Sequence, residues 1–257
     1  MYRVDFLRKK LNGWDEERIQ DDLEIGCRIM SLNKKILFLD KDPVYVEIPR
    51  RYRSLRLQQD RWVYGATDVA ITRFTHLMRS KQPWYAKFDA LYYLLQYLPA
   101  ISTFIGFLIL SFIVLLEPQD YIREYWFLGL PWMILAFIYG KYYVDSLREY
   151  GYSVWRTIVN LGRSAALTVS LTPTLTKSFF QALLRLKVGF KRTPKGRYEH
   201  LLSNIRVPIE TIVGLYALFI GINLLINQIL YTGGWFLSYS LGYIYATIRW
   251  WKDIIYR

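Results

Sequence analysis

The 257-residue sequence has one cysteine, Cys27, and two histidines, His76 and His200. A single cysteine excludes a disulfide scaffold within the chain. The two histidines are far apart in the sequence, and with one cysteine they give none of the ligand spacings of a zinc site. Intrinsic disorder is excluded as well, because 53% of the residues are hydrophobic and 18% are aromatic. The sequence therefore predicts a folded chain with a buried or unreactive thiol.

The charge of the chain is unbalanced, with 34 Lys and Arg against 21 Asp and Glu and a net charge of +13. Charged residues are frequent up to residue 87, and long stretches after it have few. The opening segment MYRVDFLRKK has no apolar stretch behind its basic residues, so we expect no signal peptide. This pattern predicts a polar N-terminal third followed by a membrane domain.

Long apolar runs define the predicted membrane spans. A spanning helix needs about 20 apolar residues, and the run over residues 90–116 contains no charge. The last run is shorter, but tryptophans at both ends are typical of interfacial anchors. The four predicted spans are residues 90–116, 125–144, 207–230 and 235–251.

A weaker apolar run covers residues 154–175. It contains Arg156 and Arg163, and arginine is costly inside a bilayer. We therefore interpret this run as an interfacial or re-entrant helix, with a fifth span as the alternative.

The charges of the connecting segments predict the topology, because Lys and Arg concentrate on the cytoplasmic side. Residues 117–124 have three acids and one arginine and are predicted to be external. Every charged residue of 177–206 except Glu199 is basic, and residues 1–88 are basic overall, so both segments are predicted to be cytoplasmic. An even number of spans must separate them, which favours the interfacial interpretation above. The chain is thus predicted to be a multi-pass protein of the cell membrane.

Residues 13–62 contain three patterns in succession. An acidic cluster leads into a segment with the apolar periodicity of a helix, and acids in a first turn complement the helix dipole. Two β-like runs follow, at residues 36–39 and 44–46. A basic helix is predicted from residue 50 to about residue 75. The acidic cluster consists of Asp15, Glu16, Glu17, Asp21, Asp22 and Glu24.

The basic helix has Gln58, Arg61 and Trp62 on one face, because they lie at positions i, i+3 and i+4. Beside a membrane domain, its arginines would also suit anionic lipid head groups. Basic residues interleaved with Tyr52 and Trp62 would suit nucleic acid too. A chain tethered to a membrane argues against that partner, so we predict no nucleic acid.

Taken in order, these motifs resemble the C-terminal half of the processive family 2 glycosyltransferases, the group that includes cellulose, chitin, mannan and hyaluronan synthases. Gln20-Asp21-Asp22 is similar to the family's TED segment, and Gln58-Gln59-Asp60-Arg61-Trp62 matches its QxxRW signature. Phe190-Lys191-Arg192-Thr193-Pro194-Lys195 resembles its FxVTPK-type gating loop. The resemblance covers roughly residues 13–200.

The resemblance implies an inverting reaction. In the family, the aspartate of the TED segment acts as general base on the acceptor hydroxyl, and here that residue is Asp22. Asp21 is the neighbouring acid that would orient or tune it. Direct displacement of a nucleotide diphosphate by the hydroxyl inverts the anomeric centre.

The resemblance also implies which residues bind substrate. Gln58 would bind sugar hydroxyls, Arg61 would contact phosphate oxygens through its forked guanidinium, and Trp62 would stack on a sugar ring. The gating loop would close over the nucleotide, and its simplest alternative role is adhesion to the membrane surface. The implied gating-loop residues are Phe190, Arg192, Thr193 and Lys195.

The sequence departs from the family in two respects. The TED segment has Gln for Thr and Asp for Glu, and the family's nucleotide-binding half is not found ahead of residue 13. A divalent metal, Mg or Mn, is implied by the family, but its usual Asp-x-Asp ligands are not in this chain. Asp40-Lys41-Asp42 has the letters but follows the acidic pair, where the family does not place its metal site. We expect a fragment, a split-gene product or a member without a donor site, inactive alone.

These observations predict a mainly α-helical protein. Residues 1–49 would be the remnant of an α/β GT-A-like catalytic domain, residues 50–88 amphipathic interfacial helices, and residues 89–251 a multi-span helical membrane domain.

The predicted function is that of a membrane-embedded inverting glycosyltransferase, as a fragment or split subunit. It would transfer a sugar from a nucleotide-sugar donor to a polysaccharide or lipid acceptor. The expected partners are these substrates, the lipid bilayer and a separately encoded N-terminal half. The alternative is an inactive remnant or a non-enzymatic membrane subunit that forms the acceptor and translocation platform.

Overall fold

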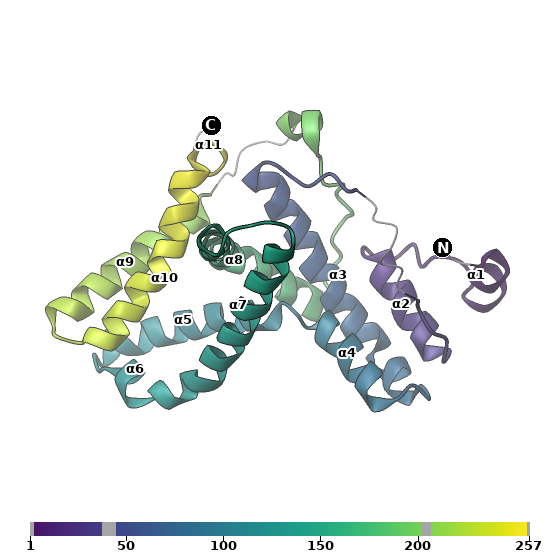
Figure 1. Ribbon diagram of the computed structural model, residues 1–257, viewed down its shortest axis with the longest axis horizontal. Helices are drawn as coiled ribbons and strands as arrows, with labels where there is room; N and C mark the ends of the chain where they lie inside the picture. The colour runs from purple at the N-terminus through teal and green to yellow at the C-terminus, as the bar shows by residue number, and fades with distance from the viewer. Residues whose placement is uncertain (1–2, 38–44, 202–206, 256–257) are drawn as a thin grey trace. The chain divides into compact units, whose positions relative to one another are not determined.

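The computed structural model describes residues 3–37, 45–201 and 207–255. Over these ranges the chain is mainly helical, as predicted, and contains no strand (Figure 1). It divides into two compact units. Unit 1 comprises Met1–Ser102 and Thr174–Ser203, and unit 2 comprises Thr103–Pro173 and Asn204–Arg257.

Unit 1 is built on α3, whose apolar residues recur at helical spacing and are buried, as Val63, Ala66, Ala70 and Leu77 show. The predicted basic helix agrees with α3. The helices that lie wholly in unit 1 are α1 (Val4–Lys10), α2 (Asp21–Ser31), α3 (Tyr52–Arg79), α4 (Trp84–Leu94) and the 3-10 helix η2 (Gly196–Leu201).

The helix expected after the acidic cluster is α2, which begins with acids in its first turn. Its buried face packs on α3, where Cys27 lies in a cluster with Val69 and Ala70 of α3 and with Leu94 of α4. Burial raises the pKa of the Cys27 thiol to about 11. The thiol is therefore buried and protonated at neutral pH.

The β-like runs form no strand in their described residues. Ile36, Leu37, Tyr45 and Val46 are exposed and lie in irregular backbone. A strand needs a neighbour to pair its backbone N–H and C=O groups, and the described parts of the chain supply none here. Residues 38–44, which include Asp40-Lys41-Asp42, lie outside the described residues.

Unit 2 contains the long helices that follow the polar third, and two helices, α5 (Leu98–Leu116) and α8 (Val154–Leu183), contribute to both units. The helices that lie wholly in unit 2 are α6 (Tyr121–Glu124), the 3-10 helix η1 (Trp126–Gly129), α7 (Leu130–Glu149), α9 (Ile209–Ile226), α10 (Leu230–Arg249) and α11 (Trp251–Ile254).

The core of unit 2 is aromatic. Phe107 of α5 is fully buried, and its ring centroid lies 4.9 Å from that of Tyr239 and 5.6 Å from that of Phe236, both on α10. Tyr243 is also fully buried, and its hydroxyl lies 2.7 Å from Thr172 Oγ1 of α8. These rings are packing residues of the core.

α9 and α10 lie side by side at very close range (Figure 1). A Cβ atom added at Gly221 of α9 would come within 2.8 Å of Leu237, and one added at Gly214 would come within 2.8 Å of Tyr243. Small residues of this kind let helix backbones approach, as at interfaces within membranes.

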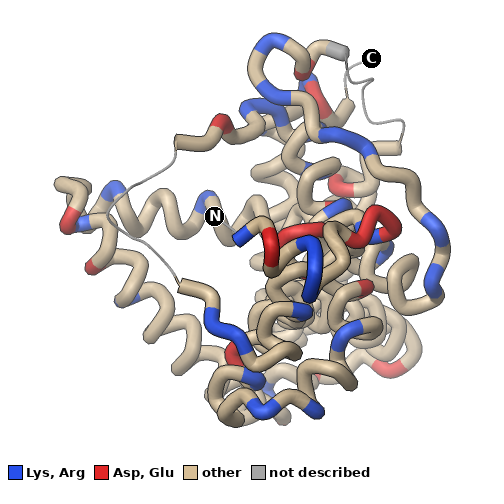
Figure 2. Tube along the Cα trace, turned by 90° about the vertical axis from the view of Figure 1, so that its right-hand side faces the viewer, with Lys and Arg blue, Asp and Glu red and all other residues tan. Residues whose placement is uncertain are grey.

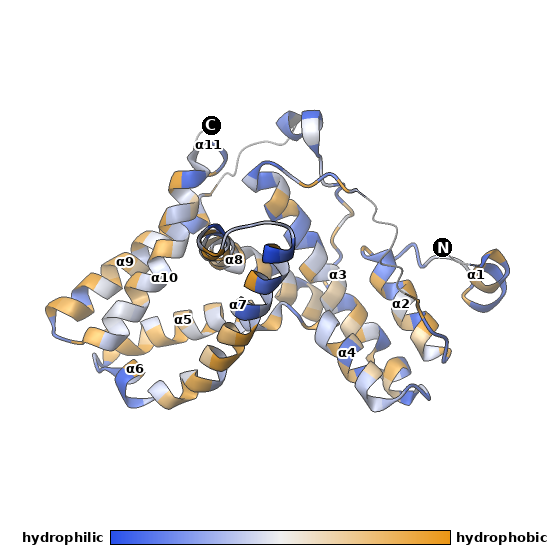
Figure 3. Ribbon diagram, viewed as in Figure 1, coloured by the Kyte–Doolittle hydropathy of each residue, from blue (hydrophilic) through white to orange (hydrophobic). Residues whose placement is uncertain are grey.

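Figure 2 shows long stretches of the chain without Lys, Arg, Asp or Glu. In the described part of the chain, three helical segments are long and apolar enough to be candidate membrane spans, and Figure 3 shows hydrophobic stretches along them. They are Leu98–Leu116, Trp126–Glu149 and Ile209–Ile226. The helices α8 and α10 are not among them, so the number of spans remains a prediction.

The apolar run at residues 90–116 is not one helix, which differs from the prediction. α4 ends at Leu94, and α5 begins at Leu98. Pro99 explains the break, because proline cannot donate the hydrogen bond of a helix interior but suits a first turn.

One carboxylate joins the segment after α5 to the start of α10. Asp120 accepts hydrogen bonds from the backbone N–H groups of Tyr231, at 3.1 Å, and Thr232, at 2.8 Å, and from the Thr232 hydroxyl. Thr232 in turn accepts the N–H of Ile122 at 3.0 Å. Burial would raise the pKa of Asp120, but these donors hold the pKa below its ordinary value.

Because the pKa of Asp120 is lower in the folded state, its carboxylate contributes to stability at neutral pH. This contribution is lost as the pH falls below about 4 and the carboxylate is protonated. We expect Asp120→Ala to cost about 1 kcal/mol at pH 7, as the loss of a helix cap does. Thermal unfolding in detergent should show the difference between the variant and the wild type shrinking as the pH falls below about 4. Glu149→Ala, an exposed carboxylate, is the control, and an equal pH-dependent effect there would contradict the assignment.

Candidate active site

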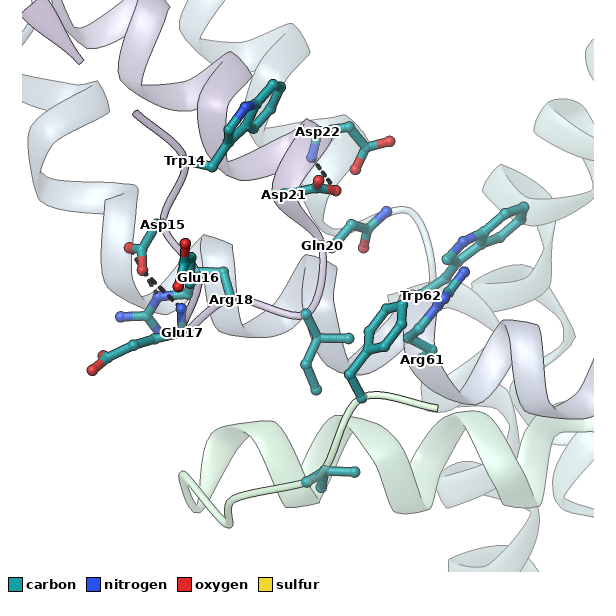
Figure 4. A pocket seen from close by; sticks show the side chains of 13 residues that line it. Trp14, Asp15, Glu16, Glu17, Arg18, Gln20, Asp21, Asp22, Arg61 and Trp62 are labelled. Atoms are coloured by element: carbon teal, nitrogen blue, oxygen red, sulfur yellow. Dashed lines mark hydrogen bonds and ion pairs between the residues drawn. The ribbon is translucent and has the colours of Figure 1, made fainter. Parts of the chain in front are cut away.

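A pocket of about 560 Å³ in unit 1 gathers residues that are far apart in the sequence (Figure 4). One wall is the segment from Trp14 to Asp22, another is formed by Arg61 and Trp62 of α3, and a third by Val188 and Phe190. The pocket therefore combines carboxylates, a guanidinium and aromatic rings.

The acidic wall ends where α2 begins. Asp21 Oδ1 accepts the N–H of Asp22 at 3.0 Å, and Asp22 Oδ1 accepts the N–H of Leu23 at 2.8 Å. These bonds occupy N–H groups of the first turn that have no helical partner. Both residues are exposed and line the pocket, and Figure 4 shows their side chains there.

The opposite wall is held by contacts between α3 and the segment after α8. The Arg61 guanidinium lies over the Phe190 ring, 5.1 Å from its centroid. The hydroxyl of Tyr64 donates to the Leu186 carbonyl at 2.8 Å. Asp60 accepts a hydrogen bond from Ser178 of α8. Arg61 of the QxxRW signature is thus packed against Phe190 of the predicted gating loop.

The structure brings together five of the nine predicted site residues. The other four do not line the pocket: Gln58 is 8% exposed and Thr193 is 6% exposed, so both side chains are buried elsewhere in unit 1. Arg192 is exposed, and Lys195 is half-buried. The five that line the pocket are Asp21, Asp22, Arg61, Trp62 and Phe190.

Gly65 is a residue of this site that sequence reasoning missed. It lies one helical turn after Arg61, on the same face of α3. A Cβ atom at Gly65 would lie 2.5 Å from Gln20 Cβ and 2.8 Å from Gln20 Oε1. Gly65 therefore lets the residue before Asp21 rest directly on α3. The sequence feature that could have identified Gly65 is its position four residues after Arg61, which places both residues on one face of a helix.

Glu24, an acid that the sequence placed in the first turn of a helix, also stabilises the acidic wall of the pocket. Glu24 is fully buried and forms ion pairs with Arg28, at 2.8 Å, and with Arg73 of α3, at 2.5 Å. Arg73 also pairs with Asp15 at 2.8 Å, and Arg28 donates to the Gly13 carbonyl at 3.0 Å. The loop that forms the acidic wall is thus tied to both α2 and α3.

Arg18 makes a further tie between this loop and α3. Its guanidinium donates two hydrogen bonds to Asp68, at 2.8 and 3.0 Å. Burial would lower the pKa of Arg18, but the hydrogen bond and charge of Asp68 raise it above its ordinary value. Arg18 therefore stays charged, and its side chain fixes the middle of the loop.

Two smaller cavities share residues with this pocket. One, of about 420 Å³, shares Arg18 and Val188 with it and adds Arg185 and Lys187. Another, of about 200 Å³, shares Arg61 and adds Lys177 and Lys191. Glu17 and Asp68 also line the first of these cavities and Asp60 the second, so basic and acidic side chains together surround this side of the site.

The divalent metal that the resemblance implies does not fit the residues described here. Across residues 3–37, 45–201 and 207–255, no three His, Cys, Asp or Glu residues are grouped so that they could hold a metal ion. Asp15 is engaged by Arg73, and Asp21 and Asp22 hydrogen-bond backbone N–H groups. We therefore derive no step through a metal.

Residues 1–140 match the family described as Glycosyl transferase family group 2. A probable glycosyltransferase of Sulfolobus acidocaldarius is 31% identical over 95% of this chain and 52% of its own length. Glucomannan 4-beta-mannosyltransferase 7 of Arabidopsis thaliana is 23% identical over 86% of this chain and 41% of its own length. The chain thus spans about half the length of the curated relatives it matches, and no solved structure matches it. The family match confirms the resemblance at the level of the family: the chain belongs to family group 2 of the glycosyl transferases.

Proposed function

We propose that this chain provides the acceptor side of a glycosyl-transfer site, with Asp22 as the general base. The observation that supports this most is the pocket itself, because it places Asp22 in one cavity with Arg61, Trp62 and Phe190. A carboxylate, a guanidinium and aromatic faces are the groups that transfer to a sugar hydroxyl needs.

The proposed reaction is a single displacement. A sugar hydroxyl is a poor nucleophile, and Asp22 accepts its proton as the oxygen forms a bond to the anomeric carbon of the donor. The bond from that carbon to the nucleotide diphosphate breaks, and the anomeric centre is inverted. Arg61 donates forked hydrogen bonds to the departing phosphate oxygens, where negative charge develops. Trp62 offers a flat face on which a sugar ring stacks.

The other predicted residues have roles in the same proposal. Asp21 orients Asp22 through the hydrogen bond to its N–H group. Arg192, Thr193 and Lys195 reach the nucleotide when the segment that begins at Phe190 closes over it.

The substrates that we propose are a nucleotide-sugar donor and a glycan or lipid acceptor. The relative named as a mannosyltransferase favours mannose or a similar hexose as the transferred sugar. The three candidate spans favour a location in the cell membrane, with residues 1–88 and 177–206 in the cytoplasm and residues 1–49 as part of a GT-A-like domain. Because the relatives are about twice as long, the chain alone would be inactive and would need a donor-binding half.

A segment exchange tests this proposal. In the archaeal relative, the segment that this chain matches is replaced by the chain, and membranes are supplied with radiolabelled nucleotide-activated mannose or glucose. We expect label in a glycan or lipid product from the exchanged protein and from the unaltered relative, and none from membranes that contain the chain alone.

Two outcomes would contradict the proposal. Transfer by the chain alone would show that its donor site is not elsewhere. An exchanged protein that inserts and folds normally but transfers no label would favour the alternative of a non-enzymatic membrane subunit.

A further inference from the structure

A pocket of unit 2 has chemistry that the proposed reaction does not use. It measures about 440 Å³ and lies where α7 is followed by α8. Its lining residues are Tyr150, Gly151, Tyr152, Arg156, Asn160 and Arg163. The three polar residues of α8 share one face, because they lie at positions i, i+4 and i+7.

The charge of this pocket is entirely positive. Neither Arg156 nor Arg163 has a carboxylate partner in the described part of the chain, and both side chains are exposed. Residues 150–176 contain no acidic residue at all. The Arg156 guanidinium lies 5.9 Å from the centroid of the Tyr152 ring, which holds it at the pocket.

Two features indicate that this pocket lies at a bilayer surface. The candidate span Trp126–Glu149 has 24 residues and is therefore about 36 Å long, enough to cross a hydrocarbon core of about 30 Å. The pocket follows its last residue directly. In the first turns of α8, Trp155 and Ile158 are apolar and exposed, at 75% and 48%, while the arginines lie on another face. A helix with these two faces lies in the interface of a membrane.

We propose that this pocket binds the phosphate group of an anionic membrane lipid. Two guanidinium groups can donate forked, charge-assisted hydrogen bonds to phosphate oxygens, and the Asn160 amide adds a neutral donor. The tyrosines at the rim have the amphipathic rings that are enriched at head-group level. The acyl chains of the lipid remain in the bilayer beside Trp155 and Ile158.

The test measures protection by lipid. The 257-residue chain is purified in detergent and its thermal unfolding is followed while phosphatidylglycerol or phosphatidylcholine is added. Phosphatidylglycerol should raise the unfolding temperature by mass action and phosphatidylcholine should not. The double variant Arg156→Gln/Arg163→Gln should weaken the apparent affinity for phosphatidylglycerol about tenfold or more.

Arg148→Gln/Arg249→Gln is the matched control, because it removes the same charge from exposed residues at the ends of α7 and α10, outside the pocket. An equal loss in this control would show general surface charge and overturn the proposal. If inorganic phosphate raises the unfolding temperature and phosphatidylglycerol does not, the ligand of the pocket is free phosphate and the lipid proposal is overturned. If the double variant does not fold, Asn160→Leu fills the pocket at constant charge and should weaken binding as well. Unchanged affinity in both pocket variants would also overturn the proposal.

Discussion

Replacing Asp22 with asparagine should lower the rate of sugar transfer by about 10²–10⁴-fold in the exchanged protein, which is the usual contribution of a general base. The substitution keeps the size of the side chain and an oxygen that can accept the Leu23 N–H, but it removes the group that takes up the acceptor proton. KM should change little, because proton removal matters only in the transition state. Initial rates of label transfer at varied acceptor concentration measure both quantities.

Two further variants sharpen this assignment. Glu16→Gln removes an exposed carboxylate of the same pocket and should cost only a few-fold, since no role is proposed for that side chain. Asp21→Asn should give an intermediate loss, because Asp21 acts through Asp22. Equal losses for Asp22→Asn and Glu16→Gln, or retained turnover in Asp22→Asn, would show that Asp22 is not the base.

Gly65→Ala should destabilise the protein by about 1–3 kcal/mol, which is the usual cost of overpacking. The direction of the stability change is informative, because replacing glycine with alanine in a helix interior normally stabilises the protein by up to about 1 kcal/mol. At Gly65 the new methyl group would meet the Cβ atom of Gln20, which cannot move without the backbone before Asp21. Chemical or thermal unfolding in detergent measures the change in stability.

Gly162→Ala on α8 is the matched control, because a Cβ atom there meets nothing within 4 Å. We expect it to stabilise the protein slightly or leave it unchanged. In the exchanged protein, Gly65→Ala should also reduce the transfer rate, since it displaces the acidic wall of the pocket, while Gly162→Ala should not. A stabilising effect of Gly65→Ala would contradict the close packing of Gln20 on α3.

Local patterns in the sequence predicted the helices well and their tertiary partners poorly. The acidic start and apolar spacing of α2 are local features, as are the apolar runs of α5 and α9. Periodicity alone did not show the break between α4 and α5, because the uncharged run passes across Pro99 without interruption. Pro99 is compatible with a kinked continuous helix or with the first turn of a new helix, and the sequence does not distinguish the two.

The candidate site shows the same limit. Motif order connected Asp22 with Arg61 and Trp62, and the structure places them around one pocket. Helical spacing placed Gln58 on the same face as Arg61 and Trp62, but the Gln58 side chain is buried. Other parts of unit 1 cover α3 on more than one side, and helical spacing alone does not show this. The contact between Gly65 and Gln20 joins two segments whose pairing no local pattern encodes.

The close packing of α9 and α10 has a consequence for how the protein is made. α10 does not qualify as a candidate span by itself, and it buries Thr232 and Ser240 together with Gly233 and Gly242. Part of its buried face, at Gly233 and Tyr243, is formed by contacts with α9. In the proposed topology, we therefore expect the translocon to release α9 and α10 into the bilayer as a pair.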